Sequence, residues 1–107
     1  IESIIAEKFQ TVISRGILNS RMKDYYDLYY LITYKEVSKE NLKKAITKTF
    51  EKRETSSNDI DKVIEEIKNA DFLRDLWRNY STHYQYANDI EFDQVINAIE
   101  KISTFIK

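Results

Sequence analysis

The chain contains no proline and a single glycine, Gly16. Proline and glycine are the residues that most often interrupt helices and form tight turns, so a chain almost without them favours long helices joined by short polar loops. No segment alternates apolar and polar residues between turn residues, as a half-buried strand would. We therefore predict an all-α fold, and the length of 107 residues suits one small helical domain.

Apolar residues recur three and four positions apart, which predicts a bundle of five or six helices. We expect a C-terminal left-handed residue at Gly16, an N-cap at Asn19 or Ser20 for the second helix, and an N-cap at Ser38 for the third. The expected helices span about residues 2–15, 21–34, 39–52, 59–68, 71–80 with continuation through His83 as the alternative, and, starting at 89 or 91, to 105.

The second of these helices, from Arg21 to Tyr34, is expected to be the central one, because it is apolar on nearly all sides and such helices are usually buried. Its charges Lys23, Asp24 and Asp27 lie on one narrow stripe. One interpretation is a cleft that binds phosphate through the lysine and takes up a proton on a carboxylate. The other is local pairing within the helix, and periodicity alone favours it.

Composition narrows the possible partners. The net charge of −1 gives no global basic field for nucleic acid, and the absence of cysteine together with one histidine, His83, argues against a zinc site. No apolar run approaches the roughly 20 residues that span a bilayer, and no signal peptide is visible. We expect no membrane partner and no DNA partner, and a cytoplasmic location.

Two further groups have a functional and a structural interpretation. Glu7 and Lys8 could approach Asp27 if the first two helices are antiparallel neighbours, although a solvated pair is favoured. Tyrosines could stack on bases, although their helical spacing favours core packing; they are Tyr25, Tyr26, Tyr29, Tyr30 and Tyr34.

The Glu7-Lys8 pair on the first helix, followed after a short loop by Arg21-x-Lys23-Asp24-x-x-Asp27, resembles the AbiEii/AbiGii toxin family of nucleotidyltransferase-like proteins. Order, spacing and flanking hydrophobic residues all agree over about the first third of the chain. The rest is compatible with the variable helical C-terminal region of that family.

The resemblance implies a polymerase-β-like core, carrying a Gly-Ser and an Asp-x-Asp metal-binding motif, followed by a helical half. It also implies a toxin of toxin–antitoxin and phage abortive-infection systems that binds a nucleoside triphosphate with Mg²⁺ and transfers nucleotides to RNA such as tRNA. Carried over by position, the nucleotide-binding residues would be Lys8, Glu7 and Arg21, and the catalytic ones Lys23, Asp24 and Asp27. Which aspartate supports catalysis stays open.

The chain lacks the Gly-Ser and Asp-x-Asp segment, and its only Asp-x-Asp, Asp59-Ile-Asp61, resembles a helix start. It also begins at Ile1 rather than at methionine. We therefore expect the C-terminal helical fragment of a larger toxin, inactive alone, that shares a cleft with an N-terminal nucleotidyltransferase core. The Mg²⁺ ligands would lie mostly on that core, with no metal site in this chain.

An alternative is a non-catalytic helical interaction module. It would use the aromatic face between Phe72 and Tyr86 or the basic face around Lys43 and Lys48.

Overall fold

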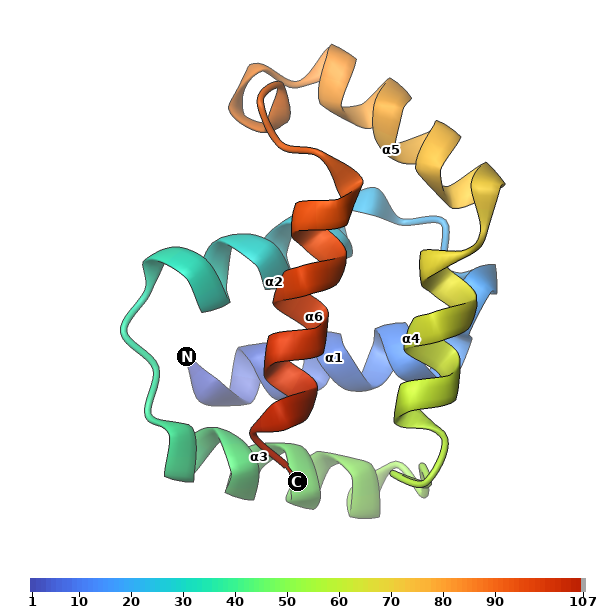
Figure 1. Cartoon of the computed structure of the whole chain (residues 1–107). Helices are drawn as coiled ribbons and strands as arrows, with labels where there is room; N and C mark the ends of the chain where they lie inside the picture. Colours follow the sequence, from blue (N-terminus) through green and yellow to red (C-terminus); the bar gives the residue numbers. More distant parts are fainter. Residues whose placement is uncertain (107) are drawn as a thin grey trace.

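The structure, a computed structural model, describes residues 1–106. Over this range the chain is all-α, as predicted, and contains no strand (Figure 1). None of the helices in the described range combines the length and the apolar character needed to cross a membrane. The elements are α1 (Glu2–Arg15), η1 (Gly16–Leu18), α2 (Met22–Tyr34), α3 (Lys39–Lys52), α4 (Ile60–Lys68), α5 (Asp71–His83), η2 (Gln85–Ala87) and α6 (Phe92–Thr104), where η denotes a short 3₁₀ turn.

Three helices share the centre of the bundle. α1 packs against α2, α3 and α4, and α6 packs against α2, α4 and α5. α2, the helix expected to be central, contacts both of these and also α5 (Figure 1). The largest fully buried side chains come mostly from these three helices, among them Tyr25, Phe9, Ile5, Leu28, Ile96 and Ile99.

The start of α2 differs from the prediction. Arg21, in an extended conformation, is the N-cap, and no side chain caps the helix, so the N-caps predicted at Asn19 and Ser20 are wrong. The reason is tertiary: Asn19 directly follows the η1 turn and is buried. Its carbonyl accepts a hydrogen bond from the Tyr25 hydroxyl at 3.3 Å, which ties the residue before α2 to a buried side chain of that helix.

The other helix ends follow local rules more closely. The Ser38 side chain accepts a hydrogen bond from the Asn41 backbone N–H, which confirms it as the N-cap of α3. α6 begins after a reciprocal capping box between Glu91 and Gln94. α5 continues to His83, the longer of the two predicted extents, and the η2 turn lies in the tyrosine-rich connection to α6.

Gly16 ends α1 with φ 56° and ψ −134°, a backbone conformation that residues with a Cβ rarely adopt. A Cβ placed there would meet Val63 Cγ1 at 3.6 Å, an ordinary contact, so space is not the constraint. The backbone conformation alone requires glycine at this position.

Replacing Gly16 by alanine is expected to lower the free energy of unfolding by about 1–3 kcal/mol, the usual strain at such a position. Urea unfolding followed by far-UV circular dichroism measures the change. Ser14→Ala, at an exposed position of the same helix, serves as the control and should change stability by less than about 0.5 kcal/mol. Equal effects of the two substitutions would contradict the argument.

Candidate functional site: a charged cluster joining two helices

Lys8 of α1 reaches across to two carboxylates of α2. Its Nζ lies 3.0 Å from Asp27 Oδ2 and 3.6 Å from Asp24 Oδ1. Because residues three apart on a helix share a face, the two carboxylates present themselves together to one ammonium group. The predicted approach of Lys8 to Asp27 is therefore present in the structure.

Two further cations complete what we call the charged cluster: Lys8, Arg21, Lys23, Asp24 and Asp27. Lys23 Nζ donates to Asp27 Oδ1 at 2.5 Å, and Arg21 Nε lies 3.9 Å from Asp24 Oδ2. The hydrogen bond to Asp27 raises the pKa of Lys23. Local pairing within α2 thus coexists with the contact between helices. With three cations against two carboxylates, the cluster has a formal charge of +1.

Exposure separates the members of the cluster. The Asp24 side chain is 8% exposed, Asp27 18% and Lys8 29%, whereas Lys23 and Arg21 extend into solvent. A nearly buried carboxylate is costly unless it is paired, so Asp24 depends on Lys8. Asp27 lies nearer the surface, and each of its oxygens forms an ion pair with a different lysine.

Glu7 lies apart from the charged cluster. Its exposed side chain lines a hollow of about 200 Å³ between α1 and α3, together with Lys48, Lys52 and Arg53. Consecutive helical residues point about 100° apart, so Glu7 and Lys8 face different neighbours. The structure brings together five of the six predicted site residues, and the roles of all six remain predictions.

Tyrosines that the sequence did not assign to the site lie beside it. The Tyr86 ring, from η2, lies 4.6 Å from the Tyr26 ring of α2, and the Tyr80 and Tyr86 hydroxyls are hydrogen-bonded. Burial raises the pKa of Tyr80, and the charge of Asp27 contributes to this rise. In the sequence, the only indication of these residues was the clustering of tyrosines between residues 80 and 86. Their position beside the charged cluster depends on the path of η2.

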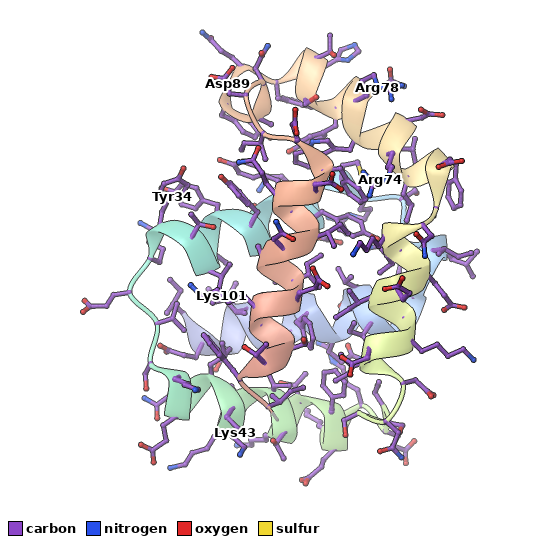
Figure 2. The ribbon with its side chains drawn as sticks, in the orientation of Figure 1. Tyr34, Lys43, Arg74, Arg78, Asp89 and Lys101 are labelled. Atoms are coloured by element: carbon purple, nitrogen blue, oxygen red, sulfur yellow. The ribbon has the colours of Figure 1, made fainter. Side chains whose placement is uncertain are left out.

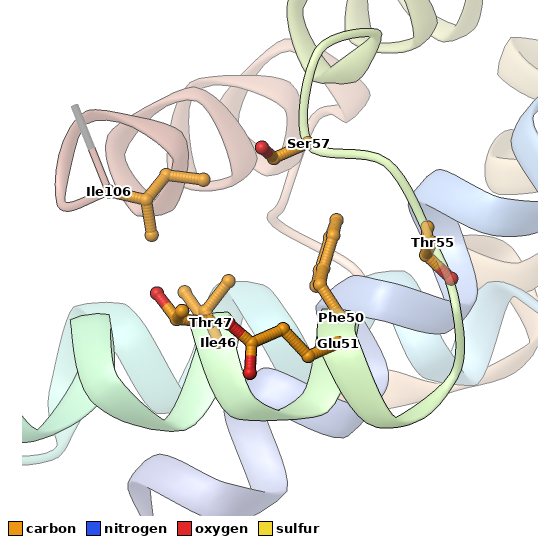
Figure 3. Close-up of a pocket in the computed structure, with 7 residues that line it drawn as sticks. All are labelled: Ile46, Thr47, Phe50, Glu51, Thr55, Ser57 and Ile106. Carbon is orange, nitrogen blue, oxygen red and sulfur yellow. The ribbon is translucent and has the colours of Figure 1, made fainter.

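A separate hollow of about 190 Å³ lies between α3, the α3–α4 loop and the end of the described chain (Figure 3). Its walls are mainly apolar, with Glu51 as the single charged residue, and none of the charged cluster lines it. It offers no phosphate-binding chemistry. The residues are Ile46, Thr47, Phe50, Glu51, Thr55, Ser57 and Ile106.

Metal-binding side chains are not gathered into one large group in the part of the chain that the structure describes. No group of three or more His, Cys, Asp or Glu side chains between residues 1 and 106 is arranged to hold a metal ion. Asp24 and Asp27 are the only carboxylates of the charged cluster, and the Lys8 ammonium contacts both. A divalent cation bound here would have to displace Lys8 and would have at most two carboxylate ligands from the charged cluster.

The aromatic face proposed as a docking surface is divided: Trp77 is buried, whereas Phe72, Tyr84 and Tyr86 are 48–49% exposed. Trp77 is 3% exposed, its indole N–H donates to the Ile90 carbonyl at 2.8 Å, and it packs against Phe92. Its role is to anchor the connection between α5 and α6. Burial removes Trp77 from that face, and the interaction-module hypothesis stays a prediction.

Comparison with known families finds one match. A family model described as "Nucleotidyl transferase AbiEii toxin, Type IV TA system" matches residues 1–98. The matched range contains the whole charged cluster and extends well beyond the first third of the chain that carries the sequence resemblance. No curated protein and no solved structure shows a significant match to the chain.

Removing Lys8 should cost stability because it leaves Asp24 charged and nearly buried. For Lys8→Met we expect a loss of about 1–3 kcal/mol in the free energy of unfolding at neutral pH. Lys44→Met, which removes a lysine from the exposed pair with Glu40, should cost less than about 0.5 kcal/mol. In a double-mutant cycle, Asp24→Asn should recover part of the Lys8→Met loss; independent effects would contradict the pairing.

Tyrosine ionisation should weaken the fold at high pH. Burial, with the Asp24 charge adding to it, raises the pKa of the Tyr25 hydroxyl above its ordinary value of 10.0. Above pH 10 the unfolded state loses a proton that the folded state keeps. The contribution of the Tyr25 hydroxyl to the free energy of unfolding is therefore complete below pH 10 and falls as the pH rises above it.

We expect Tyr25→Phe to reduce the slope of unfolding free energy against pH above pH 10 by up to about 1.4 kcal/mol per pH unit. Urea unfolding at several pH values between 9 and 11 measures the slope. Tyr84→Phe, which removes a half-exposed hydroxyl outside α2, is the control. If both variants keep the parental slope, burial of Tyr25 does not control the alkaline transition.

Proposed function

The chain belongs to the AbiEii family of nucleotidyl transferase toxins of type IV toxin–antitoxin systems, and we propose that it is the C-terminal helical domain of such a toxin. In this proposal it forms one wall of a nucleotide-binding cleft, opposite a nucleotidyltransferase core. The observation that supports it is the contact of Lys8 with both Asp24 and Asp27, which joins α1 to α2 through the residues of the family resemblance.

The cations of the charged cluster are the proposed phosphate ligands. Lys8 and Lys23 share Asp27, and Arg21 and Lys23 are largely exposed, so their charges can turn toward a triphosphate without unfolding either helix. Lysine binds phosphate as a flexible point charge, which suits side chains that must exchange a carboxylate for a phosphate oxygen.

The two aspartates take different roles in this proposal. Asp24 is nearly buried and orients Lys8, so it is a positioning residue. Asp27 is more exposed, and its Oδ1 becomes free when Lys23 turns to the triphosphate, while Lys8 keeps its contacts. It can then accept the proton of an acceptor hydroxyl whose oxygen attacks the α-phosphorus as pyrophosphate leaves. Glu7, which faces α3, has no assigned contact with the nucleotide.

The metal chemistry belongs to the partner core in this proposal. Magnesium supplies charge neutralisation at the phosphates when it is bound. The described residues do not form a site for it, so the ion is assigned to carboxylates of the N-terminal core. We accordingly predict that the 107-residue chain alone transfers no nucleotide and binds nucleoside triphosphates weakly.

In the full-length toxin, Lys8→Ala and Asp27→Asn should each lower nucleotide transfer by about 100-fold or more, the usual scale for losing a group that stabilises the transition state. Transfer of a radiolabelled nucleotide to total RNA and growth arrest after induction are the two readouts. Lys44→Ala, which removes an exposed lysine of α3, is the matched control and should leave both unchanged.

Circular dichroism of each variant separates loss of chemistry from loss of fold. A folded Asp27→Asn toxin that transfers nucleotide and arrests growth as well as the parent would contradict the proposal. Asp24→Asn should lose stability along with activity, because Asp24 acts through Lys8.

A further inference from the structure

Exposed tyrosine rings form a continuous row beside the charged cluster. The tyrosine row consists of Tyr34, Tyr30 and Tyr26 on α2, followed by Tyr86 and Tyr84 at η2. Successive ring centroids are 5.4, 6.0, 4.6 and 5.5 Å apart. Tyr34 projects from the end of α2 at the edge of the molecule (Figure 2). Residues distant in sequence thus build one aromatic surface.

Most of this row is not core. Tyr30, Tyr34, Tyr84 and Tyr86 are between 38% and 64% exposed, whereas Tyr25 of the same helix is fully buried. The α2 tyrosines therefore divide into an internal set and a surface set. Grouped exposed aromatic rings are common at binding surfaces, and here no helix of the described chain covers them.

Cations flank the row. Lys35 Nζ lies 5.7 Å from the centroid of the Tyr30 ring. Lys23, one helical turn before Tyr26, pairs with Asp27 and belongs to the charged cluster. The surface therefore combines flat π-faces with positive charge along one line, as a strand with bases and phosphates requires.

We propose that the tyrosine row binds unpaired bases of a single-stranded RNA and leads that strand to the charged cluster. This inference rests on the proposed function, since it assigns the acceptor strand to a surface next to Asp27. Tyr26 and Tyr30 stack on each other, but four of the five rings are 38–64% exposed, so the accessible aromatic surface extends along the row, which favours a strand over the base of a single nucleotide.

The test uses the 107-residue chain and a fluorescein-labelled octamer of adenosine, with fluorescence anisotropy at low salt. The octamer should bind, and an abasic phosphodiester of equal length should bind at least about tenfold more weakly, because stacking contributes at every base. Tyr86→Leu and Tyr84→Leu should each weaken octamer binding about fivefold or more. Tyr86→Phe, which keeps the ring, should retain it.

Phe72→Leu is the matched control, because Phe72 is exposed on α5 to a similar extent as Tyr86 and lies outside the row. It should leave the affinity unchanged. Equal binding of the abasic strand, or unchanged affinity in both leucine variants, would overturn the inference. Displacement of the octamer by Mg-ATP at millimolar concentration would also overturn it, since the row would then hold the base of the nucleotide.

The two proposals fail separately. If the leucine variants of the tyrosine row bind the octamer as tightly as the parent, while Lys8→Ala and Asp27→Asn abolish transfer in the full-length toxin, only the proposed RNA surface is wrong. If the row binds the octamer as described while those variants remain fully active, only the assignment of the charged cluster is wrong.

Discussion

A carboxylate cannot remain charged in a protein interior without a partner, and Asp24 has Lys8. This pair limits how α1 and α2 can pack, because Lys8 must lie opposite the first turn of α2. Tyr25 and Leu28 come directly after Asp24 and Asp27 in the sequence. Both are fully buried, and α2 packs against α6. The polar contact and the apolar packing therefore fix one arrangement of α1 on α2, and α6 packs against it.

The connection between the two helices contributes to this geometry. Gly16 allows the chain to turn sharply after α1, and η1 then shortens the path to α2. Asn19 is buried in the process, with its side-chain amide atoms lacking a protein partner while its carbonyl accepts from Tyr25. A connection this tight leaves little freedom in the relative position of Lys8 and Asp27, so the charged cluster is preformed by the fold.

Local rules were enough to predict most helices from the sequence, because apolar spacing and residues such as Gly16 and Ser38 act within one turn. The local rules gave the wrong N-cap at the start of α2. Asn19 is a residue type that often caps helices, but here it is buried and its side chain caps nothing. The pairing of Lys8 with Asp27 was predictable only on condition that two helices were neighbours. The placement of Tyr86 on Tyr26 was not predictable, since it requires the path of η2.

The charged cluster contains more cations than the burial of its carboxylates requires, and this excess is what a pair needed only for folding would lack. Folding requires one cation for the nearly buried Asp24, and Lys8 provides it. Lys23 and Arg21 add exposed charges whose pairs contribute little to stability in water, yet they leave the cluster positive beside a row of exposed tyrosine rings. Positive charge next to accessible aromatic faces is the combination that phosphates and bases recognise together. In the function that we propose, these surplus cations act on a nucleotide and an RNA strand rather than on the fold.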